Sequence, residues 1–178
     1  QNEAIANRLV EGKILGRWVG RSEFGARALG NRSIIGDPRS SDTIMRINQT
    51  IKSRDFWMPF APSILDTYAE KYLKNPKGLI GPYMTLAFET TDKAWEDLRA
   101  GLHPADRTCR PQILARQANP DYYALIEAFE TKTGVGGVLN TSFNVHGEPI
   151  IQTPQEAFDV LMRTDLDMIQ IDNILIEK

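Results

Sequence analysis

The amino-acid sequence predicts an α/β fold in which a twisted, mostly mixed sheet is flanked by helices. Short apolar runs that suit strands alternate along the chain with stretches of helical periodicity. Several of the helical stretches carry clear start or stop signals, which fix their place in this alternation. A chain of 178 residues is long enough for one core of ordinary size and too short for two comfortable domains. Residues 1–178 are therefore predicted to form a single domain.

Helices are indicated by apolar side chains that recur on one face and by residues that cap helix ends. Residues 40–41 are serines, either of which can cap a helix over residues 41–52. Asn119–Pro120 opens the clearest helix, which stops at Gly134, and Thr153–Glu156 has the pattern of a capping box. Helices are expected at residues 2–10, 41–52, 67–73, 93–100 and 120–133, and from residue 154 onward.

Strands are indicated by short apolar or alternating runs bounded by turn residues. The run at 34–35 is expected to anchor the preceding loop in the core. Residues 101–116 combine a histidine with several cations and have no clear secondary structure. Strands are expected at residues 13–19, 63–65, 84–89, 137–141 and 168–176.

The bulk properties exclude several classes of protein. A formal net charge of −2 argues against a domain that coats nucleic acid. The sequence lacks an apolar run near the roughly 18 residues that span a bilayer, and residues 1–12 lack a signal-peptide pattern, so a cytoplasmic protein without membrane or nucleic-acid partners is expected. Cys109 is the single cysteine, which excludes an internal disulfide, and it has no recognisable histidine partner. Because the chain begins in a helix and without methionine, it is expected to be part of a longer protein.

The stretch from Gly137 to Ile150 is where a short apolar run ends in small polar residues. Asn140, Ser142 and Asn144 follow or end a buried strand, so their side chains and freed backbone N–H groups can converge on the oxygens of a ligand. The alternative is a turn in which Asn and Ser side chains bond their own backbone.

Cations gather in two further stretches. Residues 20–33 combine glycines with three arginines, among them Arg27 and Arg32. This combination favours phosphate binding, because arginine donates in pairs and glycine lets the main chain come close. Lys52 and Arg54 lie at the end of the helix predicted at residues 41–52. A solvated basic loop, and cations that complement a helix C-terminus, are the alternatives for the two stretches.

His103 and Asp106 are spaced three apart, as metal ligands on a helix can be. Pro104 lies between them and disfavours a helix, so no metal site is predicted here.

Four stretches, taken in order, resemble a known family. They are residues 20–33, residues 51–62, Arg110-Pro111-Gln112, and residues 139–149 followed by Thr153-Pro154. Together they resemble the C-terminal domain of the O-carbamoyltransferases of antibiotic tailoring and nodulation-factor synthesis, the NodU/CmcH type. That domain is similar in turn to the YrdC/Sua5 fold, which makes threonylcarbamoyl adenylate. Lys52-x-Arg54 and residues 140–144 look like the nucleotide-pocket segments of that fold.

The resemblance implies a two-step reaction. Carbamoyl phosphate and ATP, with Mg²⁺, would give carbamoyl adenylate in this domain, and a partner domain would pass the carbamoyl group to a substrate hydroxyl. In the family the partner is an N-terminal, metal-containing domain of the actin-like ATPase fold. The chain would then be the adenylate-forming part of a larger enzyme, for which a homodimer is compatible with the resemblance.

The resemblance also assigns site residues. Arg27, Lys52 and Arg110 match positions that bind carbamoyl phosphate or nucleotide phosphates, and Asn140 and Ser142 match polar positions of the same pocket. Lys52, Arg110 and Ser142 are the expected catalytic residues. A general base is not needed if an ionised carbamate oxygen is the nucleophile, so neither histidine is given a role. A second group of expected phosphate-binding residues comprises Arg32, Arg54 and Asn144.

The sequence departs from the family pattern at three positions. Met58 stands where the family usually has an arginine, Arg107 where it has a glycine, and Ala26 where it has a proline. Without that arginine the site has one phosphate ligand fewer, which Arg107 could replace from another direction. Two other functions therefore stay open: a module that binds nucleotides or double-stranded RNA without turnover, and a structural domain whose basic loops form an interface.

Overall fold

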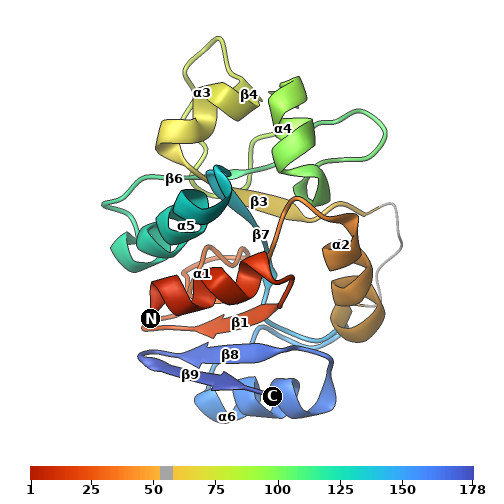
Figure 1. The fold of residues 1–178 in the computed structure, drawn as a ribbon, viewed down its shortest axis with the longest axis vertical. Coiled ribbons are helices and arrows are strands. Elements are labelled where there is room, and N and C mark those ends of the chain that lie inside the picture. The colour runs from red at the N-terminus through yellow and green to blue at the C-terminus, as the bar shows by residue number, and fades with distance from the viewer. Residues whose placement is uncertain (53–57) are drawn as a thin grey trace.

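A mixed sheet forms the centre of the molecule. In the computed structural model, which describes residues 1–52 and 58–178, seven strands lie in the order β6-β3-β7-β2-β1-β8-β9 (Figure 1). β1 pairs with β8 and β3 with β6 in parallel, and the other neighbours are antiparallel. The predicted mixed sheet is therefore confirmed. The strands are β1 (Leu15–Trp18), β2 (Arg32–Gly36), β3 (Ala61–Leu65), β6 (Gln112–Leu114), β7 (Gly137–Ser142), β8 (Met168–Ile171) and β9 (Ile174–Glu177).

Helices cover both faces of this sheet. Neighbouring residues of β2 belong to different cores, because successive side chains of a strand point to opposite faces. Ile35 joins the core formed with α1 (Asn2–Val10) and α5 (Pro120–Thr133), whereas Ile34 joins the core formed with α2 (Ser41–Ile47) and α6 (Pro154–Arg163). Val138 and Leu139 of β7 divide in the same way. The sheet is thus buried on both sides, as its continuous apolar runs require.

The predicted helix starts are confirmed in detail. The Ser40 side chain accepts from the backbone N–H of Asp42, and Asn119 accepts from Tyr122. Thr153 and Glu156 form both hydrogen bonds of a capping box at the start of α6. Gly134 closes α5 with φ of 73°, a left-handed conformation that glycine adopts without steric cost.

A smaller layer lies at the α3 and α4 end of the molecule (Figure 1). It contains a two-stranded sheet of β4 and β5 that stands apart from the main sheet. The layer is connected to the main sheet through β3 and β6. Its elements are a 3₁₀ turn (Asp66–Tyr68), α3 (Ala69–Tyr72), β4 (Leu73–Lys74), β5 (Glu89–Thr90), α4 (Asp92–Asp97) and a second 3₁₀ turn (Arg99–Gly101).

Three expected elements differ in the structure. Most of the strand expected at residues 84–89 is absent: Met84 has φ of 55°, Phe88 forms an isolated bridge with Cys109, and Glu89 begins the short strand β5. The strand expected at 168–176 is a hairpin of β8 and β9, since Asp172 adopts a left-handed conformation with φ of 46°. The helix expected at 41–52 is α-helical only to Ile47 and continues as a π-helix, Asn48–Lys52.

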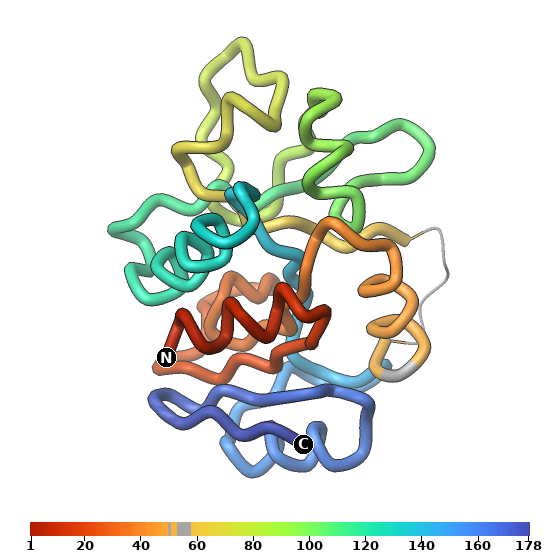
Figure 2. The backbone as a smooth tube through the Cα atoms, in the orientation of Figure 1, coloured from red at the N-terminus to blue at the C-terminus, as the bar shows by residue number. Residues whose placement is uncertain are grey.

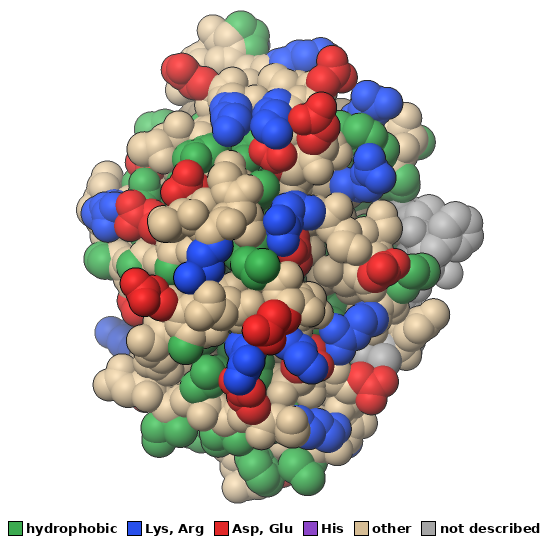
Figure 3. All heavy atoms as spheres, in the orientation of Figure 1, with side chains coloured by type: hydrophobic (Ala, Val, Ile, Leu, Met, Phe, Trp, Pro, Cys, Tyr) green, Lys and Arg blue, Asp and Glu red, His purple; other side chains and the backbone are tan. Residues whose placement is uncertain are grey.

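The two ends of the chain lie in the same half of the molecule, as Figure 2 shows. β1 pairs with β8, and the Nε of Arg8 lies 2.8 Å from a carboxylate oxygen of Glu177. On the face in Figure 3, Lys and Arg side chains are interspersed with Asp and Glu side chains. Within residues 1–52 and 58–178, each helix is too short or too polar to cross a membrane.

Candidate active site

The glycine and arginine loop between β1 and β2 is folded back on itself by Glu23. One carboxylate oxygen of Glu23 accepts from the backbone N–H groups of Leu29 and Asn31, each at 2.7 Å, and from Arg32 at 3.3 Å. A single acidic side chain therefore satisfies backbone donors that the loop would otherwise expose. The loop is held in a defined shape, and Arg27 lies within it.

The same loop also packs against α5. Gly30 has φ of 116°, and a Cβ atom added there would lie 2.2 Å from the Tyr122 ring, so only glycine allows this close approach. The fully buried Arg17 donates to the Gly30 carbonyl and to the Asp121 carboxylate. Burial lowers the pKa of Arg17, and the Asp121 charge partly offsets this effect. The loop is thus packed against the core as well as closed on itself.

A small cavity of about 80 Å³ opens between this loop and the ends of β3 and β7. A cavity of this size can hold a small anion such as phosphate. Ser142 and Asn140 point to the same face of β7, because side chains two residues apart on a strand do. The cavity is lined by Ala26, Arg27, Ala28, Pro59, Phe60, Ala61, Met84, Arg110, Asn140, Thr141 and Ser142.

Four of the predicted site residues therefore meet at one cavity: Arg27, Arg110, Asn140 and Ser142. Both arginines are exposed, and within the described residues neither has a carboxylate partner. Arg116 and Arg163, by contrast, pair with Glu127 and Glu148. Among the described residues that line the cavity none is acidic, and two are arginines whose guanidinium groups carry positive charge. This arrangement can bind an anion of phosphate type.

Lys52 lies directly behind Ser142 and is 2% exposed. Its Nζ lies 2.6 Å from the carbonyl and 3.2 Å from the hydroxyl of Ser142, and 2.9 Å from the carbonyl and 2.6 Å from the side-chain oxygen of Asn144. The Ser142 hydroxyl also lies 2.6 Å from the Asn144 side-chain oxygen. Lys52 thus fixes the conformation of the segment that follows β7 and places a positive charge behind the cavity.

Asn140 is anchored by a chain of buried amide and hydroxyl groups. Its Nδ2 donates to the Ala28 carbonyl at 3.2 Å and to the Ser63 hydroxyl at 3.0 Å. Ser63 in turn donates to Oε1 of Gln112 at 2.7 Å, and Nε2 of Gln112 donates to the Leu29 carbonyl at 3.0 Å. These bonds join β3, β6 and β7 to the loop of Arg27.

The two remaining predicted residues differ in placement. Arg32 lies outside the cavity lining and is buried: its guanidinium lies 4.1 Å from the Trp18 ring and donates to the carbonyls of Val19, Gly20 and Asn31. Arg32 therefore holds the loop instead of facing the cavity. Arg54 lies outside the described residues.

A second hollow of about 160 Å³ adjoins the first. The two share Pro59, Phe60, Ala61 and Arg110 as lining residues. His103 lines the second hollow, and its Nδ1 lies 3.3 Å from Asp106. In the described part of the chain, no three His, Cys, Asp or Glu side chains are grouped as metal ligands. Arg110 thus lies where two neighbouring hollows meet.

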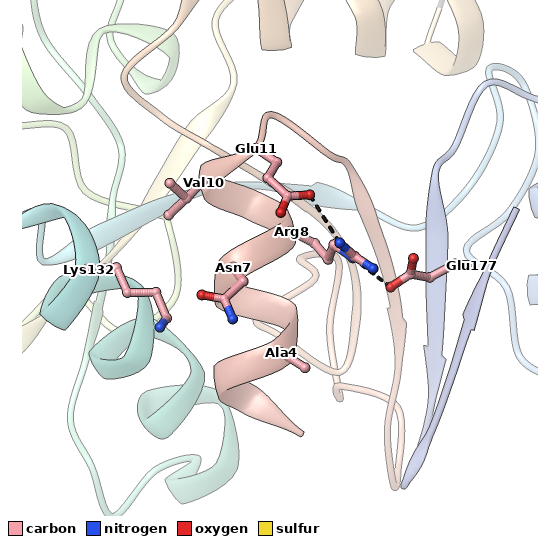
Figure 4. Close-up of a pocket in the computed structure, with 7 residues that line it drawn as sticks. All are labelled: Ala4, Asn7, Arg8, Val10, Glu11, Lys132 and Glu177. Carbon is pink, nitrogen blue, oxygen red and sulfur yellow. Dashed lines mark hydrogen bonds and ion pairs between the residues drawn. The ribbon is translucent and has the colours of Figure 1, made fainter.

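A larger hollow of about 520 Å³ lies between α1, Lys132 at the end of α5, and Glu177 of β9 (Figure 4). Arg8 lies between two acids there, 3.2 Å from Glu11 and 2.8 Å from Glu177 (Figure 4). Its lining includes none of the predicted site residues that the structure describes. Because Arg8 already pairs with two acids there, the small cavity is the better candidate for an anion site.

Sequence reasoning missed several residues that shape the site. Glu23, Ser63 and Gln112 were not singled out, although each bonds the loop or Asn140. Gln112 belongs to the Arg110-Pro111-Gln112 stretch and could have been found there. Glu23 gave no signal, because the partners of its carboxylate are backbone groups brought close by folding.

Two residues that depart from the family pattern, Arg107 and Met58, lie in different surroundings. Arg107 has φ of 59°, a conformation that favours glycine. Its guanidinium lies 4.7 Å from the Trp95 ring and 3.5 Å from Asp92, and it lines neither hollow. Met58 is exposed beside Pro59, which lines both hollows. Arg107 is therefore not placed to bind a phosphate in place of an arginine at position 58.

Known sequences similar to this chain include carbamoyltransferases. The sequence matches the family described as Carbamoyltransferase C-terminus over residues 6–178. Nodulation protein NolO of Bradyrhizobium diazoefficiens is 39% identical over 176 residues, which cover 98% of this chain and 32% of that protein. The 3'-hydroxymethylcephem-O-carbamoyltransferase of Amycolatopsis lactamdurans is 33% identical over 151 residues, covering 85% of this chain and 28% of that enzyme. The chain thus spans about a third of the length of such relatives.

Solved structures confirm the fold. Full-length HypF, in a phosphate- and nucleotide-bound form, matches 97% of this chain and 25% of its own length with a TM-score of 0.70 at 20% identity. YciO of E. coli matches 99% of this chain and 86% of its own with a TM-score of 0.65 at 16% identity. At such identities the likeness concerns the fold alone, and it agrees with the predicted YrdC/Sua5-like architecture. The family match and the NolO and cephem relatives together place this chain in the carbamoyltransferase C-terminal family, of the NodU and cephem O-carbamoyltransferase type.

Proposed function

We propose that this chain is the adenylate-forming part of an O-carbamoyltransferase, which uses carbamoyl phosphate and ATP to make carbamoyl adenylate. The observation that carries the proposal is the small cavity that Arg27 and Arg110 share with Asn140 and Ser142. Two guanidinium groups from distant parts of the chain, without carboxylate partners among the described residues, support a phosphorylated ligand. Membership of the carbamoyltransferase family favours carbamoyl phosphate among such ligands.

The proposed reaction has two parts. Carbamoyl phosphate first loses its phosphate to water and leaves carbamate. An oxygen of the carbamate then attacks the α-phosphorus of ATP, forms the new P–O bond and releases pyrophosphate, which gives carbamoyl adenylate. The carbamate oxygen is already ionised, so this second step needs no residue to remove a proton.

Negative charge builds up on phosphate oxygens in both parts, so cations and oriented donors should supply most of the stabilisation. We assign this role to Arg27 and Arg110, and we assign hydrogen bonding of the same oxygens to Ser142. Lys52 is buried behind Ser142, so its charge acts on the ligand through the segment it holds. Lys52 is in this proposal a positioning residue, and Asn144 shares its role.

Mg²⁺ is proposed to enter with the phosphates of ATP. The described residues contain no group of three acidic, histidine or cysteine side chains that would hold it alone. Mg²⁺ commonly binds through substrate phosphates and only one or two carboxylates, which is compatible with this surface.

The second half of the reaction would occur elsewhere. The chain spans about a third of the length of its carbamoyltransferase relatives, so transfer to a hydroxyl is assigned to the part of such proteins that this chain does not match. The expected partner is an N-terminal domain of the actin-like ATPase fold.

The test is an exchange assay. The chain is incubated with ATP, Mg²⁺, carbamoyl phosphate and labelled pyrophosphate, and label incorporated into ATP is measured. Exchange should require carbamoyl phosphate, and Arg110→Ala should reduce it about 10- to 150-fold, the loss expected for one hydrogen-bonded charge contact of about 1.5 to 3 kcal/mol. Arg116→Ala is the matched control, because Arg116 is exposed, pairs with Glu127 and lines neither hollow.

Two results would contradict the proposal. Absence of both exchange and ATP binding would remove the adenylate-forming role. RNA binding with a steep dependence on salt and no effect of ATP would instead indicate a binding module.

A further inference from the structure

The two edges of the seven-stranded sheet differ in how they are covered. At one edge, the backbone N–H of Ile113 in β6 donates to the Gly81 carbonyl at 2.7 Å, so the loop between β4 and β5 covers this strand. At the other edge lies β9, which among the described residues pairs with β8 alone (Figure 1). β9 therefore presents backbone groups to which another strand can add.

The register of the β8–β9 hairpin shows which groups of β9 point outward. Ile171 lies opposite Ile174 across the turn. The residues that close such a short hairpin exchange both backbone hydrogen bonds, and along an antiparallel pair they alternate with residues that do not. The bond from the Lys178 N–H to the Asp167 carbonyl, at 3.0 Å, continues this alternation. The N–H and C=O groups of Leu175 therefore point away from β8.

The side chains of β9 leave this edge unprotected. Edge strands commonly carry a lysine, a proline or a bulge that prevents pairing, and the segment Ile174–Glu177 contains none of these. Ile174 is 61% exposed. Ile176 lies on the same face of the sheet, because it is two residues further along the strand. An exposed apolar side chain thus lies on an open edge.

Helix α6 runs beside this edge. Lys178, which follows β9, donates from Nζ to the carbonyls of Leu161 and Thr164 at 3.3 and 2.8 Å. Phe158 and Met162, one turn apart on α6, are exposed. Figure 3 shows hydrophobic side chains at the end of the molecule where Figure 1 places α6. A strand that adds to β9 would thus meet further apolar side chains nearby.

We propose that β9 pairs with β9 of a second copy of this chain, antiparallel and about a two-fold axis at Leu175. The outward backbone groups of the two Leu175 residues then exchange both hydrogen bonds. Ile174 lies opposite Ile176 of the other copy, in the kind of pair whose side chains are closest, so Ile174 becomes covered. The inference is independent of the proposed function, because none of these residues lines the cavity.

The edge is complementary to itself, which favours a second copy as the partner. In this register Glu177 faces Asn173 of the other copy, so no like charges oppose each other. The Glu177 carboxylate keeps its own partner, Arg8, at 2.8 Å. A two-fold contact uses the same surface on both copies, and the loop of Gly81 covers the opposite edge of the sheet. Pairing therefore stops at a dimer.

The first experiment measures the oligomeric state of the whole chain by sedimentation over a range of concentrations. The wild-type chain should form dimers in reversible equilibrium with monomers. Ile174→Lys places a charge against Ile176 of the other copy and should raise the dissociation constant about tenfold or more. Ile80→Lys is the matched control: the same substitution at an exposed position of the β4–β5 loop should leave the dissociation constant unchanged.

The second experiment tests the register by cross-linking. On the proposed axis the Cα atoms of the two Leu175 residues lie about 5.5 Å apart, within the range that a disulfide spans. Mild oxidation should therefore link Leu175→Cys chains into dimers, because the native Cys109 is buried and does not compete. Ile80→Cys, treated at the same concentration, should stay unlinked.

Each outcome supports or overturns the proposal. A monomeric wild-type chain overturns it and leaves the edge to a different partner. A dimer that Ile174→Lys and Ile80→Lys weaken alike overturns it as well, because the contact would then lie elsewhere. If Ile174→Lys does not fold, cross-linking decides: rapid linkage of Leu175→Cys supports the register, and linkage no faster than that of Ile80→Cys overturns it.

Discussion

A carboxylate oxygen of Glu23 accepts a hydrogen bond from the backbone N–H of Leu29 at 2.7 Å, and this contact closes the loop in which Arg27 lies. The same oxygen accepts from two further backbone N–H groups. The loop therefore does not depend on its ligand to take shape. The position of one cavity cation is set by an acid that does not itself line the cavity.

Glu23→Ala should loosen this loop. Three backbone donors lose a charged acceptor, and because Glu23 is partly exposed, water replaces some of the loss. We expect the free energy of unfolding in urea to fall by about 1 to 3 kcal/mol and phosphate affinity to fall with it. Glu70→Ala, an exposed acid without a hydrogen bond among the described residues, should change stability by less than about 0.5 kcal/mol. Equal stability of the two variants would contradict the role of Glu23.

Lys52→Met should lower the free energy of unfolding more than Glu23→Ala does, because methionine has a similar length but cannot donate a hydrogen bond. At least two carbonyls and two side-chain oxygens, on Ser142 and Asn144, would lose their shared donor in a buried place. The expected loss is about 2 to 4 kcal/mol in the free energy of unfolding, measured by urea denaturation. Lys77→Met, on an exposed loop, is the control and should be nearly neutral. A stable Lys52→Met chain with unchanged phosphate affinity would show that Lys52 does not position the site.

Met58→Arg should strengthen anion binding. Met58 is exposed next to Pro59, which lines both hollows, and the family usually carries arginine at this position. One added charge contact would raise phosphate affinity about tenfold at low salt and less at high salt. Met45→Arg makes the same change in net charge on the exposed side of α2, away from the cavity lining, and should have little effect. If both variants gained similar phosphate affinity, the gain would come from net charge and not from the place of residue 58.

Because the Cys109 thiol is buried, the free energy of unfolding is expected to fall at alkaline pH. Burial raises the pKa of its thiol to about 12, from an ordinary value of 9.0. The folded chain holds this proton more tightly than the unfolded chain does, so stability is complete below pH 9 and falls as the pH rises from 9 toward 12. At pH 10 the expected loss is roughly 1.4 kcal/mol.

The measurement compares urea unfolding of the wild-type chain and Cys109→Ala from pH 8 to pH 10.5. The variant carries a cavity cost that does not depend on pH, so the difference between the two proteins should shrink as the pH rises. A constant difference would mean that the thiol does not titrate as its burial requires. Slow alkylation of the native thiol at neutral pH is expected for the same reason.

Local signals in the sequence predicted much of the architecture. The capping box at Thr153, the Asn119 cap and the stop at Gly134 act within a few residues, so they can be read without knowing the fold. The same holds for the apolar run of β7. The failures were of another kind: the turn at Asp172 and the left-handed Met84 interrupt segments whose apolar pattern alone favours a continuous strand.

Site residues divide in a similar way. Arg27, Arg110, Asn140 and Ser142 could be proposed from residue type and motif, and the structure brings them to one cavity. Arg32 has the same residue type and lies in the same stretch as Arg27, yet its guanidinium packs on Trp18 and bonds loop carbonyls. Two arginines of one stretch thus have different environments. Only the path of the folded backbone shows which of them lines the cavity.

The sequence by itself determined the α/β class, most helix starts, the family and the residue types able to bind an anion, because these depend on local pattern and composition. Only the tertiary structure decided which cations share a cavity, that Lys52 lies behind Ser142, and that Arg32 is buried against Trp18. The physical reason is that these properties depend on distances between atoms far apart in the chain, and on burial that no single segment can produce alone.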